Sequence, residues 1–215
     1  MVRANRRGTQ AARMSLLAPR SDQVSAWSNT AIALGRLDVP AGFLSGVSTD
    51  LFGEQLAGRL STEGRQADLI IGNNVYAHVP DINDFTRGLK RALKPGGIIT
   101  LEFPHLMRLL EHNQFDTVYH EHYSYLSLYT VCRIFESVGL RVWDVEELPT
   151  HGGSLRVYGC HAEDDFPTNS VVRELLESEK TFGMREAAVY ESFQSRADRV
   201  KNDLLMFLLN QKANN

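Results

Sequence analysis

The chain has 215 residues, of which 43% are hydrophobic, so it can bury the core of one domain with an appendage. Its formal net charge of −3 and its lack of any apolar run of membrane-spanning length argue against nucleic acid and a bilayer as partners. Its two cysteines, Cys132 and Cys160, cannot build a disulfide framework or a cysteine zinc site, which makes a reducing cytoplasm the expected location.

Composition divides the chain into three parts. Residues 1–47 begin with five arginines in the first 21 positions and no acidic residue before Asp22. This start is compatible with a transit peptide, but we expect a divergent, disordered arm. Residues 48–163 alternate short apolar runs with helical patterns, which predicts an α/β domain. Residues 164–215 are charged, with apolar residues at helical spacing, which predicts a helical segment.

The individual elements are predicted from hydrophobic periodicity and from capping and turn residues. In chain order we expect a helix over 51–60, a strand over 67–75, a helix from Asp81 or Asn83 to Leu93, a turn over 94–97, a strand over 98–103, a short helix over 106–111, a helix over 128–138 closed by Gly139, two strands over 140–148 and 154–161 joined as a hairpin, and one or two long helices over 171–209.

The first two strands are nearly continuous apolar runs, which is typical of parallel strands covered on both faces. A helix-length segment joins them, as a parallel crossover requires. We therefore predict an α/β fold with part of a doubly wound sheet, in which these strands are adjacent and parallel. The same sheet should contain residues 140–148 and end in the C-terminal strand pair.

The ends of the two predicted parallel strands carry side chains that can bind ligands. Asn73, Asn74 and His78 follow the first strand, while Glu102 and His105 end or follow the second. Ligands of open α/β sheets bind at the carboxyl ends of the strands, so we expect these residues to share one edge.

The densest set of reactive side chains is the run Tyr119-His120-Glu121-His122, within residues 113–127. Imidazole has an ordinary pKa of about 6.5, and a neighbouring carboxylate or phenol can orient the ring and adjust its basicity. Such a group can remove a proton from carbon near neutral pH. The alternative is a polar loop whose side chains only satisfy one another.

Several motifs occur in a fixed order along the chain. They are Asn73-Asn74-Val75-Tyr76-Ala77-His78-Val79-Pro80-Asp81, Glu102-Phe103-Pro104-His105, the segment 119–125, and Pro149-Thr150-His151-Gly152-Gly153-Ser154-Leu155-Arg156-Val157, and an "LKPGG" turn stands at 93–97 before the second strand. Together they resemble the class I S-adenosylmethionine-dependent C-methyltransferases that act on nucleotide-linked 4-keto deoxysugars. The resemblance extends from about residue 50 to the C-terminus. It implies a Rossmann-like methyltransferase sheet, of which residues 48–163 would be the second half.

The resemblance also implies a mechanism and a set of site residues. A base removes the proton next to the ketone, and the enolate carbon then takes the methyl group of S-adenosylmethionine. The base falls on His122, and Tyr119, Glu121 and His78 would orient it or stabilise the enolate oxygen. By the same resemblance we expect the cofactor to contact Asn73 and Asn74, and the sugar nucleotide to contact His105, His120, Tyr123 and His151.

Three features of the family pattern have no counterpart in this sequence. There are no clustered N-terminal cysteines, there is no glycine-rich loop before Ala67, and the chain ends where relatives continue into a further α/β domain. We therefore expect the middle of a longer enzyme, in which residues 164–215 lead toward that domain. By itself it should bind S-adenosylmethionine weakly and depend on a complementary polypeptide.

Two other interpretations remain beside the methyltransferase. The chain could be a non-catalytic remnant or binding module that retains the sugar-nucleotide half. Alternatively, His120 and His122 could hold a metal ion together with His78 or His105, since alternate residues of an extended segment can face one ion. The order of the motifs already accounts for these histidines, so we predict no metal site.

Overall fold

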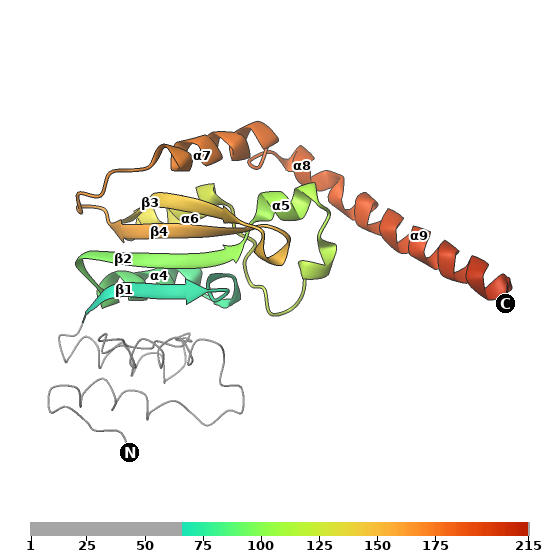
Figure 1. The fold of residues 1–215 in the computed structure, drawn as a ribbon, viewed down its shortest axis with the longest axis horizontal. Helices are drawn as coiled ribbons and strands as arrows, with labels where there is room; N and C mark the ends of the chain where they lie inside the picture. The colour runs from blue at the N-terminus through green and yellow to red at the C-terminus, as the bar shows by residue number, and fades with distance from the viewer. Residues whose placement is uncertain (1–65, 215) are drawn as a thin grey trace, which may run out of the picture. The chain divides into compact units, whose positions relative to one another are not determined.

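The computed structural model describes residues 66–214, and the expected arm over 1–47 and helix over 51–60 lie outside the described residues. In chain order the elements are β1 (Ala67–Asn73), the 3-10 turn η2 (Tyr76–His78), α4 (Ile82–Ala92), β2 (Leu93–Pro104), α5 (Leu106–Glu111), η3 (Phe115–Thr117), α6 (Leu128–Ser137), β3 (Leu140–Leu148), η4 (Thr150–Gly152), β4 (Ser154–His161), α7 (Ser170–Phe182), α8 (Ala187–Glu191) and α9 (Phe193–Ala213) (Figure 1).

The four described strands form one mixed sheet with the order β1-β2-β4-β3. β1 pairs parallel with β2, and α4 makes the crossover between them. β4 pairs antiparallel with both β2 and β3. The predicted α/β class, the parallel pair and the C-terminal hairpin are therefore confirmed.

The segment between the two parallel strands differs from its prediction at one point. Asp81 caps α4 as expected, since its Oδ1 accepts a hydrogen bond from Asp84 N at 2.8 Å. Residues 94–97, however, are not a separate turn: β2 already begins at Leu93, and its pairing with β1 slips between Ala67 and Leu69. Gly96 takes a φ of +76° there, which lets the strand absorb the extra residues as a bulge.

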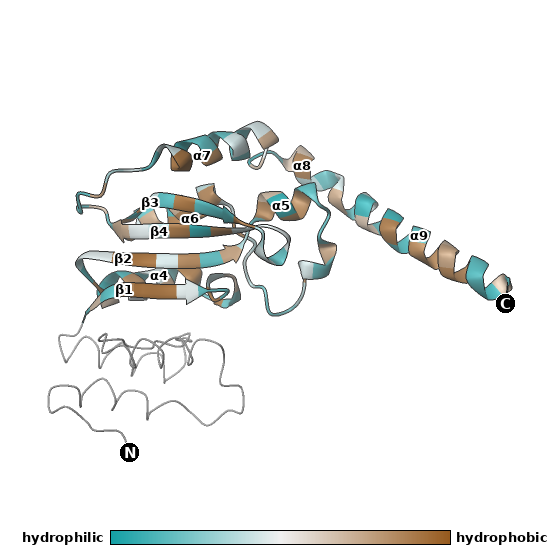
Figure 2. Cartoon of the chain, viewed as in Figure 1, coloured by the Kyte–Doolittle hydropathy of each residue, from teal (hydrophilic) through white to brown (hydrophobic). Residues whose placement is uncertain are grey.

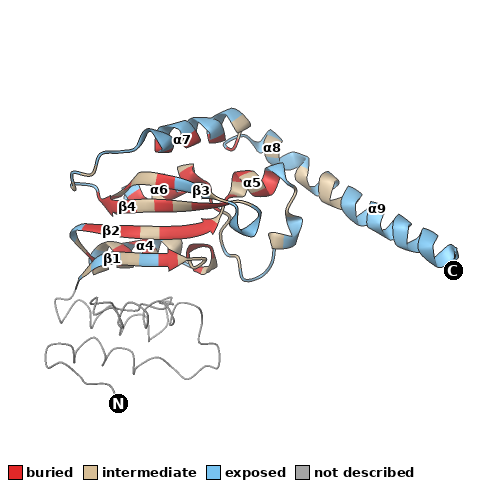
Figure 3. Cartoon of the chain, in the orientation of Figure 1, coloured by how far each residue is buried: buried red, intermediate tan, exposed pale blue. Residues whose placement is uncertain are grey.

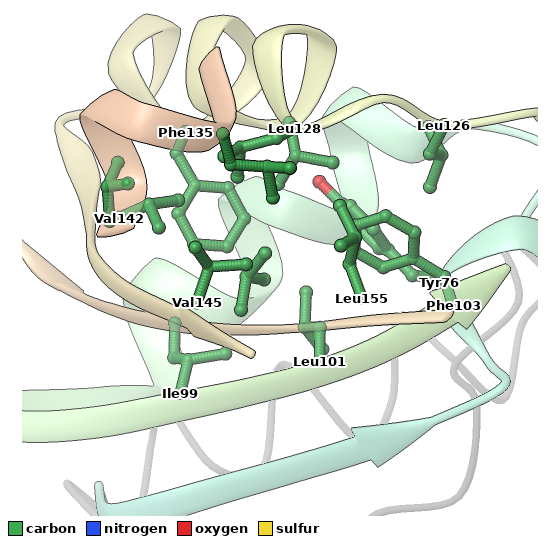
Figure 4. Packing of buried hydrophobic residues seen from close by; sticks show 14 of the residues in the cluster. Tyr76, Ile99, Leu101, Phe103, Leu126, Leu128, Phe135, Val142, Val145 and Leu155 are labelled. Carbon is green, nitrogen blue, oxygen red and sulfur yellow. The ribbon is translucent and has the colours of Figure 1, made fainter. Parts of the chain in front are cut away.

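The core lies between the sheet and the helices that pack on it (Figure 4). Leu101 and Phe103 of β2, Leu155 of β4, and Leu128 and Phe135 of α6 are fully buried. Burial of each such side chain stabilises the fold by roughly 1.5–3 kcal/mol. α6 approaches β4 closely because Gly159 has no side chain: a Cβ there would lie 2.4 Å from the Phe135 ring. This packing holds α6, and with it the end of the preceding loop, against the sheet.

The C-terminal segment forms two long helices, α7 and α9, as one of the expected arrangements, with the short helix α8 between them. α7 contributes Val172 and Leu175 to the core. It is capped at its C-terminal end by Gly183, which has a backbone φ of +88° that residues with a side chain rarely adopt. The short helix α8 and the long helix α9 follow. α9 carries six consecutive apolar residues, 204–209, that are each 52% to 58% exposed (Figures 2 and 3).

Candidate active site

The carboxyl ends of β1 and β2 lie side by side, as predicted. Asn73 stands opposite Glu102 in the ladder, and the backbone N–H of Asn74 donates to the carbonyl of Glu102 at 2.8 Å. The turn η2 follows at once and carries His78. The parallel pairing thus brings the polar ends of both strands to one edge of the sheet.

The loop that carries the histidine motif is fastened to η2 by backbone hydrogen bonds. The N–H groups of Tyr123 and Ser124 both donate to the carbonyl of Ala77, at 2.9 and 3.1 Å. These bonds place the ring of His122 with its centroid 4.7 Å from that of His78. The centroid of the Tyr119 ring lies 4.3 Å from the centroid of the His122 ring. Two imidazoles and a phenol from separate parts of the chain therefore form one cluster.

Backbone carbonyls define the tautomers of both imidazoles. His122 Nδ1 lies 2.8 Å from the carbonyl oxygen of Thr117, and His78 Nδ1 lies 2.9 Å from that of Glu121. A carbonyl oxygen can only accept, so each Nδ1 carries the hydrogen and donates it. When its ring is neutral, the Nε2 atom of each therefore keeps an unshared electron pair. This is the state that a general base needs.

The side chains of the other motif residues, His120, Glu121 and Tyr123, are exposed to solvent. The His120 side chain is 90% exposed, and the Glu121 carboxylate is 62% exposed with His120 4.0 Å away. Tyr123 is also exposed. Glu121 thus contacts the cluster through its backbone carbonyl rather than through its carboxylate.

A small cavity lies beside His122, against residues that include Thr117 and Tyr125. Its volume is only about 10 Å³, which is close to the smallest space that holds one water molecule. This cavity is therefore too small for a sugar.

The turn η4 brings a third histidine to the same edge of the sheet. Asn74 Nδ2 donates to His151 Nε2 at 2.9 Å. The turn is held on both sides, because Gln114 Nε2 donates to the carbonyl of Gly152 at 2.7 Å and Thr150 Oγ1 donates to Glu102 Oε1 at 3.1 Å. His151 consequently lies next to the predicted cofactor-binding residue Asn74.

Backbone strain is concentrated around these segments. Among the described residues, the non-glycine positions with positive φ are Asn74, Asn113 and His151, at 52° or 53°. In addition, Asn74 Oδ1 and Asn113 Oδ1 are buried without a hydrogen-bond partner. Strained backbone and unsatisfied buried acceptors both carry a free-energy cost and are found together at functional sites.

One predicted site residue does not belong to the cluster. The side chain of His105 is 0% exposed, and its Nε2–H donates to Glu179 Oε1 at 2.8 Å. The described structure exposes no part of this imidazole to a ligand, and the expected contact between His105 and the sugar nucleotide stays a prediction. The reason for this burial is tertiary, because α7 covers this residue from a distant part of the chain.

Several supporting residues were missed by sequence reasoning. Arg156 Nη2 donates to the buried carboxylate of Glu102 at 2.8 Å, and this bond, more than any other cause, raises the pKa of Arg156. Arg156 stands in one of the quoted motifs, so the motif was a signal. No comparable reason in the sequence singles out Thr117, Gln114 or Glu179. Each contacts the site through a hydrogen bond that involves a backbone carbonyl or a residue far away in the sequence.

Neither a set of metal ligands nor a membrane-spanning helix is present among residues 66–214. Within residues 66–214, no three His, Cys, Asp or Glu side chains are close enough to hold a metal ion. The histidine metal site therefore lacks a ligand set in that range. None of the helices in the same range is long and apolar enough to cross a membrane.

Two family models match the sequence. A model described as a methyltransferase domain matches residues 7–145, which is more than half of the chain. A model described as a C-methyltransferase C-terminal domain matches residues 149–215. The first match ends within β3, and the second begins between β3 and β4.

The chain is also similar to a curated protein, the C-methyltransferase NovU of Streptomyces niveus. The two are 40% identical over 163 residues, which is 76% of this chain and 37% of NovU. The chain therefore spans little more than a third of that relative's length.

Similar solved structures include a SAM-dependent methyltransferase from Thermotoga maritima, with 16% identity, a TM-score of 0.37, and coverage of 46% of this chain and 57% of that one. Another is the magnesium protoporphyrin IX methyltransferase of Synechocystis PCC 6803, with 14% identity, a TM-score of 0.36, and coverage of 47% and 48%.

Proposed function

Because the chain belongs to the S-adenosylmethionine-dependent methyltransferases, we propose that it acts as a C-methyltransferase on a nucleotide-linked 4-keto deoxysugar. S-adenosylmethionine is the cofactor of this family. The observation that carries the proposal is the hydrogen bond from His122 Nδ1 to Thr117, which leaves Nε2 available as a base on an accessible loop. The C-methyltransferase match supports carbon as the atom that is methylated.

The residues of the cluster divide the chemistry between them. His122 Nε2 takes the proton from the carbon next to the ketone. The electrons of the broken C–H bond form the enolate, whose negative charge lies on the former ketone oxygen. His78 and Tyr119 lie against His122 and can stabilise that oxygen or orient the base. Glu121 contributes by holding His78.

The residues at the end of β1 fit a ligand that carries hydrogen-bond donors. Asn74 Oδ1 is a buried acceptor without a partner, and S-adenosylmethionine carries hydroxyl and ammonium groups that could donate to it. When bound, the cofactor supplies an electrophilic methyl group to the enolate carbon. Asn73 and Asn74 would hold it, while His120, Tyr123 and His151 would contact the sugar nucleotide.

The test of this function isolates the proton-transfer step. Exchange of deuterium from solvent into a nucleoside-diphosphate 4-keto deoxysugar can be followed by NMR without methyl transfer. His122→Asn should slow the exchange by about 10²–10⁴-fold, as expected for loss of a general base. His112→Asn makes the same change on a half-exposed histidine outside the cluster and should leave the rate unchanged. Exchange at the parental rate in His122→Asn would show that His122 is not the base.

Cofactor binding separates this function from a non-catalytic binding module. We expect the isolated chain to bind S-adenosylmethionine weakly, because the sequence has no glycine-rich loop before Ala67. Calorimetric titration of the chain with the cofactor measures this directly. A dissociation constant near 1 μM, or about −8 kcal/mol, would contradict the expectation of weak binding. Complete absence of both cofactor binding and deuterium exchange would favour the binding module.

The partners and the location complete the proposal. The substrate would be the sugar nucleotide, and the methylated product would enter deoxysugar biosynthesis. A complementary polypeptide would supply the cofactor contacts that this sequence lacks. Cys132 and Cys160 are both free thiols, which supports a reducing compartment such as the cytoplasm.

A further inference from the structure

Glu179 is a buried carboxylate that the proposed chemistry does not use. It lies on α7 and is 1% exposed. Its two oxygens accept three hydrogen bonds: Oε1 from His105 Nε2 at 2.8 Å and from Leu128 N at 2.6 Å, and Oε2 from Tyr129 N at 2.9 Å. A buried charge is tolerated only when it is bonded in this way. Its position at the first turn of α6 also places a negative charge at the positive end of that helix.

The three donors flank one continuous piece of chain. His105 directly precedes residues 106–127, and Leu128 directly follows them. The two ends meet, because Leu106 N donates to the carbonyl of Leu126 at 2.9 Å. Residues 106–127 therefore form a closed loop, and Glu179 binds both sides of its neck. His122, the proposed base, is carried on this loop.

We propose that Glu179 is a positioning residue for His122, an inference that rests on the proposed function. The carboxylate holds the neck of the loop closed, and the loop in turn holds His122 Nδ1 against Thr117 and beside His78. Glu179 lies in the region that matches the C-methyltransferase C-terminal domain, whereas His122 lies in the region that matches the methyltransferase domain. The C-terminal helices thereby set the geometry of the base.

Other contacts at this neck act in the same sense. The guanidinium of Arg185, just after α7, lies 4.5 Å from the centre of the Tyr129 ring. Met184 N donates to the carbonyl of Glu179 at 3.1 Å, which closes the C-terminal end of α7. Among the side chains of residues 66–214, only the Glu179 carboxylate bonds to both sides of the neck, which makes it the position to change.

The first test compares two substitutions on the same helix. Glu179→Gln keeps the shape of the side chain but removes its charge, and its amide nitrogen must face a donor N–H group. Glu177→Gln makes the same change on an exposed residue that pairs with Lys180, so it is the matched control. The readout is the nitrogen NMR spectrum of His122, which reports the tautomer. His122→Asn assigns the signal.

We expect the His122 Nδ1–H tautomer to lose population in Glu179→Gln and to stay unchanged in Glu177→Gln. A purely structural contribution of Glu179 would lower the unfolding midpoint but leave the His122 tautomer of the folded protein unaltered. That second result would overturn the proposal. Neither readout needs substrate or cofactor. The outcome of this test therefore does not depend on the outcome of the deuterium-exchange test, and the two can fail separately.

The second test uses the unaltered chain and applies even if Glu179→Gln does not fold. Amide hydrogen exchange is measured for Leu128 and Tyr129 at the neck, and for Tyr123 and Ser124 in the loop. If Glu179 holds the loop through its neck, all four amides should open together, with protection factors within roughly tenfold of one another. Loop amides that exchange about a thousandfold faster than the neck amides would show independent opening and would overturn the proposal.

Discussion

At the scale of single residues, backbone carbonyls orient three of the imidazoles in the described part of the chain. Thr117, Glu121 and Leu93 each provide the carbonyl that accepts from a histidine, namely His122, His78 and His161. Such partners define which ring nitrogen carries the hydrogen and hold the ring in place. In the candidate site this leaves the Nε2 atoms of two neighbouring rings free for proton transfer.

Tyr76 gives a prediction at the same scale. Its hydroxyl is buried and donates to Thr86 Oγ1 at 2.7 Å, because Thr86 itself donates to the carbonyl of Ile82. Burial raises the pKa of Tyr76 well above its ordinary 10.0, although the bond to Thr86 opposes this. The folded protein therefore keeps the phenol neutral, while the unfolded chain ionises above pH 10. The stability from this group is complete below pH 10 and is lost as the pH rises further.

Urea unfolding of the parent and of Tyr76→Phe between pH 7 and pH 11 checks this expectation. At pH 7 the variant should be less stable by about 1 kcal/mol, because it lacks the hydrogen bond. Above pH 10 the free energies of unfolding should converge, since only the parent loses stability through this tyrosine. A constant difference across the whole range would contradict the assignment.

At the scale of elements, the turn η4 depends on close contacts that only glycine permits. Gly153 has a φ of +123°, and a Cβ there would lie 2.8 Å from both Cβ and Cγ of Arg108 on α5. The carbonyl of Gly153 also accepts from His105 N at 3.0 Å. The tight packing of η4 against α5 is what brings His151 to Asn74.

Gly153→Ala should therefore destabilise the protein by about 1–3 kcal/mol, because the side chain is strained in φ and meets α5. Gly88→Ala is the matched control: Gly88 lies within α4, and its Cβ would meet nothing within 4 Å. That change should stabilise the protein by roughly 0.5–1 kcal/mol. Chemical denaturation of both variants measures the two effects. Equal stabilities for the two variants would mean that η4 is free to move away from α5.

At the scale of the whole described part, the two family matches share one core. The methyltransferase match ends within β3, and the C-methyltransferase match begins just before β4. β3 and β4 pair along their entire length, and α7 adds Val172 and Leu175 to the same hydrophobic cluster. The boundary between the two families is therefore not a boundary between two independently packed units.

The C-terminal half of α9 is the exception, since its apolar residues 204–209 are exposed on all sides of the helix. Exposed apolar surface of this kind promotes association in water. The double variant Leu205→Gln with Leu208→Gln should lower self-association, as measured by sedimentation at increasing protein concentration. The unfolding midpoint should stay the same, because neither side chain belongs to the core cluster. A midpoint that falls by several degrees would show that residues 204–209 pack against the core.

The sequence by itself determined the elements with local causes. The apolar runs predicted β1 and β2 as a parallel pair, Asp81 predicted the start of α4, and Gly139 predicted the end of α6. These features depend on neighbouring residues and on the period of the pattern, both of which can be read along the chain. The order of the motifs likewise indicated that His78, Tyr119 and His122 belong together, and the structure places their rings side by side.

Only the tertiary structure decided which of these side chains can meet a ligand. His105 is enclosed by Glu179, a partner 74 positions away, and His151 reaches Asn74 across 77 positions. The bulge at the start of β2 depends in the same way on its pairing with β1. Such contacts result from the packing of α7 and η4 onto the sheet, which leaves no periodic or capping signal in the local sequence. A buried carboxylate in a charged helix therefore looks in sequence like its solvent-exposed neighbours.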